Sequence, residues 1–510
     1  MNEGRGVWRS SLLRIVPVAL VFAGLLAPPL LSQTKLDGKY YSLHGFLRQH
    51  FSMNMEDPPE VPEDNKYDIS MARTTAYLEL NLFAADWASF TVIGRADYEY
   101  MTSYLETLDD LSAADLKDFY NNVDLREWYV DLQASKRTTF RLGRQQVVWG
   151  RTDFFRGMDI FHGFDFTWRS FLEVENEQLR KPLILASAQV QFPKVDGTLQ
   201  LVVRPALDDE EDIGNTYDLR GGRWANQPNK GFDFLTPIPD VFPGVPYNYH
   251  HPQADTDDIT GGIRWSALAA GIDYSIAYLR TFNNDPVVNS VFNPFGAPPI
   301  NDFAEFIYPD VDLFGFTLVK DFAESDFVLR GEFTYTFDQP YNIGTEFFGG
   351  ALPGFGGIVE KDTLRSMLAI DKPMDWPMKV LGASRPAFFN LQLFDTWLVS
   401  FDEKDDIVAL AGYGAPIKRH TTIATFILGW NYRNDRINPT IAAGADLSNG
   451  GGFIIPSVQF VFGNHWRLRL EYDWFTDSGN KLPGEIEQDT TLFGYFANND
   501  QFVLRATFQF

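Results

Sequence analysis

The residues that could carry chemistry are seven histidines, many alternating arginines and carboxylates, and one aromatic-rich stretch. The sequence contains no H-E-x-x-H metal site, no G-x-S-x-G nucleophile elbow and no G-x-x-x-x-G-K-[ST] phosphate loop. A serine–histidine pair could still assemble from distant strands, and His250–His251 could bind a metal, but surface histidines are the simpler interpretation. We therefore expect neither an enzyme nor a metal or other cofactor.

Charged residues recur at every second position of short segments. In 466–474 (WRLRLEYDW) every even position is apolar, while the odd positions are charged. Alternate side chains of a strand point to opposite faces, so one face is apolar and the other ionic. The residues that we expect on pore-lining faces are Arg73, Arg95, Asp97, Arg141, Arg264, Arg330, Glu332, Arg467, Arg469, Glu471 and Arg505. Rings of fixed charge would select solutes, whereas a salt-bridged ladder would only stiffen and wet the wall.

Segment 149–182 is the aromatic-rich stretch. Its candidates for an apolar constriction are Phe154, Phe155, Phe161, Phe164, Phe166, Trp168 and Phe171. A solvated loop would not keep so many aromatic rings exposed. If the strands of this chain close into a barrel, we expect this segment to fold into its lumen; the alternative is a packed external cap without a role in transport.

Segment 206–257 is longer and differs in composition. It is acidic at 208–212 and rich in glycine and proline further on, which indicates a long external loop or lid. Asp255, Asp257 and Asp258 could bind a cation there, but acidic loops are usually only solvated.

Eighteen segments with period-two alternation could supply the elements that position these residues. They are 39–53, 69–83, 87–100, 124–133, 138–148, 183–192, 198–205, 258–267, 271–282, 311–321, 326–337, 363–372, 387–395, 421–432, 437–447, 453–462, 465–475 and 500–510. Many have about ten residues or slightly more, the length with which a tilted strand crosses a bilayer. Short turns alternate with long loops such as 338–362, except that 373–386 is long for a turn and 448–452 is short for a loop. The pattern predicts an all-β, transmembrane antiparallel β-barrel of 16–18 strands.

The two ends of the chain fit export and barrel assembly. Residues 1–32 resemble a signal peptide, with three arginines before an apolar run and a cleavage site near Ser32; an uncleaved anchor is the alternative. This leaves 33–510 as the barrel. The last strand ends on Phe510, as in the signal that barrel-assembly machinery reads, although an ordinary edge strand could end so by chance.

Composition excludes several classes of protein. The 510 residues include no cysteine, so disulfides, thiolate zinc sites, iron–sulfur clusters and c-type haem are ruled out. The net charge of −25 argues against nucleic acid as a partner. Acidic loops could instead be bridged by divalent cations to lipopolysaccharide.

One stretch resembles a known family. Segment 141–150 (RLGRQQVVWG), preceded by 125–132 (LREWYVDL), resembles the proteobacterial outer-membrane family catalogued as domain of unknown function 1302 (DUF1302). Segments 330–333 and 369–373 are similar to later parts of that family. The resemblance implies a porin-type barrel, associated with an RND-type exporter and a periplasmic lipid-binding-like protein, and thus traffic in hydrophobic compounds. It implies no catalytic residues.

We therefore expect an outer-membrane channel for small hydrophobic or amphipathic compounds, in contact with outer-membrane lipid and working with such an exporter. A general ion or nutrient porin, a surface adhesin or structural barrel, and an outer-membrane hydrolase remain as alternatives.

Overall fold

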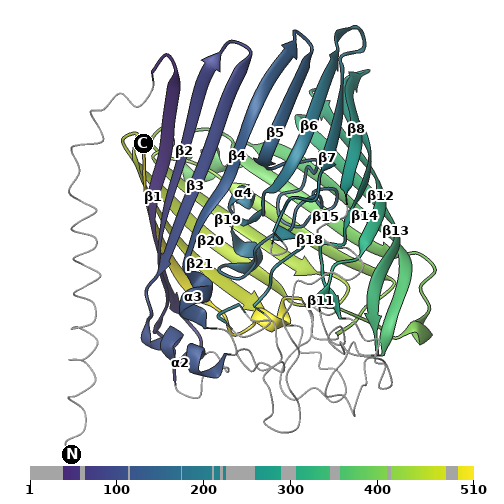
Figure 1. Cartoon of the computed structure of the whole chain (residues 1–510). Helices are drawn as coiled ribbons and strands as arrows, with labels where there is room; N and C mark the ends of the chain where they lie inside the picture. The colour runs from purple at the N-terminus through teal and green to yellow at the C-terminus, as the bar shows by residue number, and fades with distance from the viewer. Residues whose placement is uncertain are drawn as a thin grey trace, which may run out of the picture.

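The protein is a closed antiparallel β-barrel (Figure 1). The computed structural model describes residues 38–57, 64–112, 115–173, 175–209, 212–218, 222–224, 259–288, 306–344, 356–409, 415–477 and 492–510. The main sheet has 20 strands in this part of the chain, two of which are the short β16 and β17, so the wall itself has 18. The expected fold and strand number are confirmed.

The wall strands are β1 (Tyr41–Asn54), β2 (Ile69–Ala85), β3 (Ala88–Glu99), β4 (Asn122–Ser135), β5 (Thr138–Gln145), β6 (Leu183–Phe192), β7 (Gly197–Arg204), β8 (Thr260–Ala269), β9 (Ile272–Phe282), β12 (Asp310–Phe322), β13 (Phe327–Ile343), β14 (Gly357–Met374), β15 (Ala387–Leu398), β18 (His420–Gly429), β19 (Ile437–Asp446), β20 (Gly452–Phe462), β21 (Trp466–Thr476) and β22 (Gln501–Gln509). The short strands are β10 (Val287–Val288), β11 (Phe306–Ile307), β16 (Ile407–Ala409) and β17 (Ala415–Pro416). The helices are α2 (Ser103–Leu111), α3 (Leu116–Tyr120), α4 (Asn176–Leu179) and α5 (Trp376–Leu381), with 3₁₀ turns η1 (Ser170–Leu172), η2 (Pro193–Val195), η5 (Glu403–Asp405) and η6 (Gly494–Phe496). None of the described helices has the length and apolarity needed to cross a membrane.

The barrel closes where its first and last strands meet. β1 pairs with β2 on one side and with β22 on the other, with Leu47 opposite Phe508. The terminal Phe510 exchanges two backbone hydrogen bonds with Gly45, at 3.1 and 3.0 Å. Among the 18 wall strands of the described chain, closure leaves no unpaired edge, which is the condition for a β-structure inside a bilayer.

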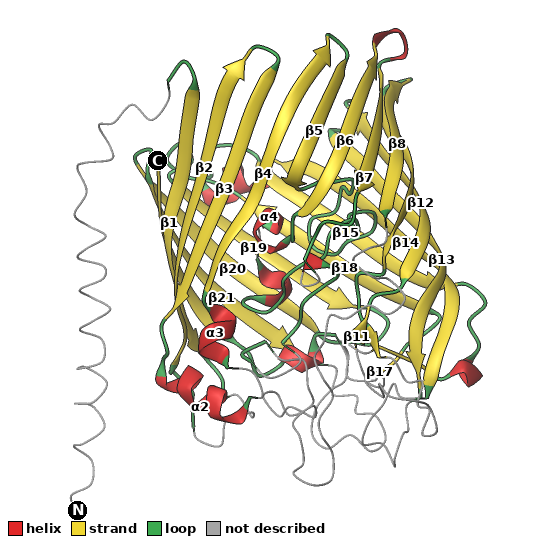
Figure 2. Ribbon diagram, in the orientation of Figure 1, coloured by secondary structure: helices red, strands yellow, loops and turns green. Residues whose placement is uncertain are grey.

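The two ends of the barrel differ. At one end, which we call the turn end, adjacent strands are joined by tight connections, and both the start of β1 and the chain terminus lie there (Figures 1 and 2). Between β8 and β9 the connection is Ala270–Gly271, with φ of 52° and 70°; positive values at both positions match the twist of a two-residue hairpin. The longer connections lie at the opposite end, the loop end.

One connection differs from expectation, and a helix accounts for the length of another. β13 runs to Ile343 and β14 begins at Gly357, so much of the expected loop 338–362 is a hairpin. A register shift between Thr336 and Gln339 breaks the alternation there, and Pro340 makes the sequence read as a loop. The turn 373–386, long as the sequence indicates, contains α5; Gly382, with φ of 69°, is the C-cap that follows the helix.

The outer face of the wall is apolar and exposed, while the inner face is polar. Leu78, Phe314 and Trp474 are exposed over 46%, 51% and 46% of their surface, whereas the polar neighbours on the other face, such as Thr317 and Asp473, are buried. A water-soluble monomer rarely leaves a continuous apolar belt exposed. The wall therefore has the surface of a barrel that lies in lipid.

Candidate functional site

The most distinctive feature of the interior is the segment 149–182, here called the luminal segment. It leaves the wall after β5, crosses the inside of the barrel with η1 and α4, and returns as β6 (Figure 2); of this range, residue 174 lies outside the described residues. Its backbone is tied to the wall at Glu332 on β13, which accepts hydrogen bonds from the N–H groups of Arg151, at 2.6 Å, and Met158. The wall thus holds the segment by its main chain as well as by side chains.

A buried ion network fixes the second half of the luminal segment. Arg169 contacts Glu471 and, at 3.4 Å, Asp473, both on β21. Glu173 accepts from Arg505 of β22 at 3.1 Å. Burial alone would raise the pKa of Glu173, but Arg505, Arg169 and Arg48 outweigh it and lower the pKa to about 2. The carboxylate is therefore ionised throughout the pH range in which bacteria live, and its ion pair with Arg505 persists across that range.

The first half of the luminal segment is anchored on the opposite wall. Arg330 of β13 pairs with Asp153 at 2.7 Å and with its own wall neighbour Asp371 at 2.7 Å. Arg151 reaches Asp273 of β9 at 3.2 Å. The segment is thus tied to β9 and β13 at one side and to β21 and β22 at the other, which spans the lumen.

The candidate constriction residues pack in three groups against the inner wall. Phe161 is 3% exposed and lies beside Trp149 in a cluster with Leu185, Val202 and Leu279 of β6, β7 and β9. Phe154, Phe155 and Phe171 form the second group, in contact with Phe394, Phe453, Phe475, Phe493 and Phe496. Phe164, Phe166 and Trp168 form the third, with Met71 and Leu179. The rings thus lie inside the barrel, and their role as a constriction stays a prediction.

His162 fixes the base of the luminal segment. Its Nε2 accepts from the N–H of Val147 at 2.8 Å, and its Nδ1 lies 2.9 Å from the carbonyl of Lys181, to which it donates. Burial, together with the nearby Arg180, lowers the pKa of His162 to about 3. The neutral ring therefore links the two points where the segment leaves and rejoins the wall. No sequence pattern distinguishes this histidine from the six others.

The candidate pore-lining charges are brought together in four places. Asp97 pairs with Arg73 at 2.9 Å and with Arg95 at 3.0 Å. Arg141 pairs with Asp131 at 2.7 Å. Arg264, whose Nη1 donates to the carbonyl of Val148 at 3.5 Å, lines the same cavity as Arg141. Arg330 and Glu332 hold the luminal segment as described above, while Arg467, Arg469, Glu471 and Arg505 gather near β21 and β22. Their influence on solutes stays a prediction.

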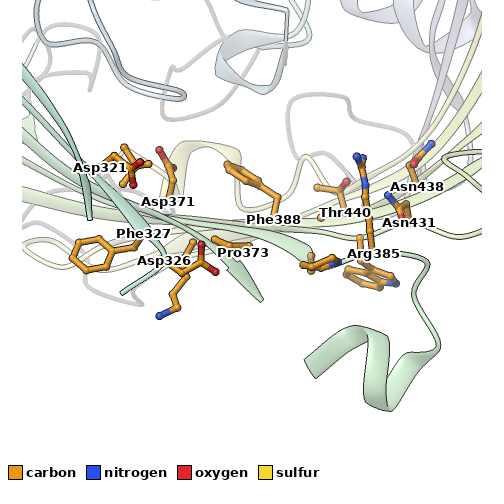
Figure 3. Close-up of a pocket in the computed structure, with 16 residues that line it drawn as sticks. Asp321, Asp326, Phe327, Asp371, Pro373, Arg385, Phe388, Asn431, Asn438 and Thr440 are labelled. Carbon is orange, nitrogen blue, oxygen red and sulfur yellow. The ribbon is translucent and has the colours of Figure 1, made fainter. Parts of the chain in front are cut away.

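Several cavities open inside the barrel. One of about 530 Å³ lies near the turn end between β12 and β19, where Asp371, Phe388 and Thr440 project to the same side of the sheet (Figure 3). Another of about 520 Å³ is lined by Arg141, Arg264 and other residues of β4 to β8. A third of about 460 Å³ lies between the luminal segment and the wall, beside Tyr77 and Arg126. The luminal segment therefore does not fill the interior.

The described parts of segment 206–257 also contact the wall. Arg144 of β5 pairs with Asp212 at 2.8 Å, and Arg223 pairs with Glu99 of β3 at 3.0 Å. Trp224 donates its indole N–H to the carbonyl of Trp168 in the luminal segment at 2.9 Å. These parts pack against other elements, and the external loop or lid expected for 206–257 stays a prediction. The candidate cation ligands Asp255, Asp257 and Asp258 lie outside the described residues, as does the expected signal peptide 1–32. Within the described part of the chain, no three His, Asp or Glu side chains are grouped as metal ligands.

The chain matches one protein family and is similar to several solved structures. The family model "Protein of unknown function (DUF1302)" matches residues 63–510. No curated protein matches the sequence. Acinetobacter baumannii OccAB1 is 10% identical over 94% of this chain and 99% of its own, with a TM-score of 0.46. Pseudomonas aeruginosa OpdK, solved with vanillate, is 10% identical over 92% and 98%, with a TM-score of 0.45. The outer membrane channel DcaP of Acinetobacter baumannii is 9% identical over 92% and 97%, with a TM-score of 0.37. These likenesses concern the barrel architecture alone.

Proposed function

We propose that this chain, which belongs to the DUF1302 family of proteins of unknown function, is a bacterial outer-membrane channel for small hydrophobic or amphipathic compounds. The observation that carries the proposal is the closed wall with an apolar exposed outer face and a charged, cavity-containing interior. Such a barrel can lie in lipid and still enclose water. The short connections then face the periplasm and the long ones the outside.

The aromatic side chains of the luminal segment favour hydrophobic or amphipathic cargo. Phe155 and Phe171 belong to a group of rings that lies inside the barrel, beside cavities with charged linings. The apolar part of a solute could pack against these rings, whereas a hydrated polar nutrient would gain nothing from such contacts. In this proposal, an RND-type exporter and a periplasmic lipid-binding-like protein deliver the solute to the turn end of the barrel.

A general ion or nutrient porin is the second candidate, and one observation favours it. The cavity beside β4 to β8 is lined almost entirely by polar and charged side chains, including Asp131, Arg141 and Gln200. Charged linings select hydrated ions and small polar solutes.

Reconstitution of the purified chain separates these functions. We expect discrete conductance steps in planar bilayers, and we expect a small neutral aromatic solute to reduce the current more than a sugar of equal size. The double variant F155A/F171A should lose this difference, while the outward-facing L391A should retain it. Equal effects of the aromatic solute and the sugar on the native channel would favour the general porin. A barrel that inserts but never conducts would favour an adhesin or structural role and overturn the proposal.

A further inference from the structure

Four arginines meet in a small cavity inside the barrel. The cavity has a volume of about 220 Å³ and is lined by Arg48 of β1, Arg467 and Arg469 of β21, and Arg505 of β22. Its remaining lining is neutral except for Glu175 of the luminal segment. We call it the arginine cavity. The lining of this cavity thus combines four guanidinium groups with a single carboxylate.

Three of the arginines have carboxylate partners. Arg48 donates from Nη2 to both carboxylate oxygens of Glu175, at 2.8 and 3.0 Å, and from Nε to the hydroxyl of Thr507 at 3.2 Å. Arg469 donates to Glu471 at 2.7 Å from Nε. Arg505 donates from Nη1 to Glu173 at 3.1 Å. Glu173 and Glu471 also form ion pairs with Arg169, so neither carboxylate belongs to an arginine of the cavity alone.

Some guanidinium N–H donors of the arginine cavity have no acceptor among the described residues. Arg467 donates only to the carbonyl of Trp466, at 2.9 Å, and forms no ion pair with any described residue. Arg505 is 5% exposed, yet its Nε and Nη2 have no hydrogen-bond partner among the residues that the structure describes. Buried donors without partners are rare and costly, and each usually indicates a group that is missing. Guanidinium groups bind carboxylates with two parallel hydrogen bonds. An anion such as a carboxylate could accept hydrogen bonds from these donors.

We propose that the arginine cavity binds the carboxylate of an amphipathic solute. The assignment of this solute as cargo rests on the proposed function, but binding itself does not. Ligand pockets for whole drug-sized molecules measure roughly 300–1,000 Å³, so a cavity of 220 Å³ holds only the head group and a small part of the body. The apolar remainder of the solute extends into the lumen.

Glu175 shows how such a carboxylate would be held. Its two oxygens on Arg48 reproduce the contact of a bound acid, and its side chain is 34% exposed, so solvent and solute can reach it. A solute carboxylate competes with Glu175 for Arg48. Because Glu175 belongs to the luminal segment, its displacement also releases one of the ties between that segment and the wall.

Binding of benzoate to the detergent-purified full chain tests the proposal, with benzamide as the neutral isostere and inorganic phosphate as the other anion. Calorimetry should show benzoate binding that weakens as salt is added, and little benzamide binding. Losing one charge-assisted contact in R467Q should weaken benzoate about tenfold, and removing the competing carboxylate in E175Q should tighten it several-fold. R280Q is the matched control, because Arg280 does not line the arginine cavity and pairs with Asp310 at 2.9 Å; it should bind benzoate as the native chain does.

The outcomes separate this inference from the channel function. Equal affinity for benzoate and benzamide, or unchanged benzoate affinity in both R467Q and E175Q, would overturn the inference. Binding of phosphate without benzoate would likewise overturn the assignment to carboxylates. Circular dichroism and retained conductance in bilayers show that each variant is folded. If the channel conducts and benzoate does not bind, only this inference falls.

Discussion

Arg169 is the residue whose replacement should most strongly loosen the luminal segment. Its side chain is 1% exposed, and its partners Glu471 and Asp473 are 2% and 0% exposed, so all three charges are buried. In R169Q the two wall carboxylates lose this partner while the luminal segment still covers them. Displacement of the segment would return water to them. The substitution therefore raises the free energy of the conformation in which the luminal segment packs on the wall, relative to conformations in which it has moved away.

The size of the effect follows from burial. Removing one partner of a buried ion pair costs about 3–5 kcal/mol. Since 1.4 kcal/mol corresponds to a factor of ten, the population of displaced segment should rise by about a hundredfold or more. The matched control is Arg280, which pairs with Asp310 at 2.9 Å but is 52% exposed. An exposed pair contributes at most about 1 kcal/mol, so R280Q should leave the segment in place.

Single-channel recording and limited proteolysis would measure the change. We expect R169Q to show larger or noisier conductance steps and faster cleavage within 149–182, with R280Q behaving as the native chain. R169K should be intermediate because one ammonium group cannot match the fork of a guanidinium. Native conductance, native noise and native proteolysis in a folded R169Q protein would refute the reasoning that this ion network seats the segment.

Further predictions concern pH and packing. The pKa of His162 is about 3 in the folded chain and 6.5 in the unfolded chain. Between these values the unfolded chain binds more protons, so His162 makes the free energy of unfolding rise with pH. H162Q should flatten this rise in urea titrations at several pH values. Burial raises the pKa of Asp212 from 3.8 to about 6, despite Arg144 and Lys181. Between these values the folded chain binds more protons, so Asp212 makes the free energy of unfolding fall with pH, and D212N should remove this fall. Native pH dependence of stability in both H162Q and D212N would contradict the two assignments. At Gly214, with φ of 68°, an added Cβ would lie 1.9 Å from a ring carbon of Tyr308; G214A should therefore detach this part of segment 206–257 and speed its proteolysis, whereas G382A, at φ of 69° with open space around it, should not.

The wall could be predicted from the sequence because lipid on one face and a polar interior on the other impose a period of two. Segment 465–475 was predicted as a strand and is β21, Trp466–Thr476. The rule fails where neither face meets lipid or the alternation breaks, as at the end of β13, where Pro340 still pairs with Glu360. Strand boundaries there depend on pairing with a distant partner, which a single sequence does not reveal.

The interior was much less predictable. The aromatic content of 149–182 indicated that it should be buried, but not which wall residues would hold it. Arg169 and Glu471 are 302 positions apart, and Arg48 and Thr507 are 459 apart. Arg48, Arg169, Glu173 and Glu175 were accordingly missed as site residues, and so was His162. Glu173 and Glu175 alternate with a spacing of two like any wall residue, so their ion pairs with Arg505 of β22 and Arg48 of β1 follow only from closure of the barrel, which brings these two strands together.

The central claim, that one face of each strand meets lipid and the other water, is tested most directly on β20. Gln459 lines the arginine cavity, while its neighbour Phe460 stacks beside the exposed Phe462 of the outer face. The chain has no native cysteine, so Q459C and F460C each introduce a single thiol. In liposomes, a water-soluble maleimide should label Q459C and spare F460C, and a fluorophore at 460 should be quenched by lipid-borne quenchers. Equal labelling at both positions, or quenching by lipid at 459, would contradict the account.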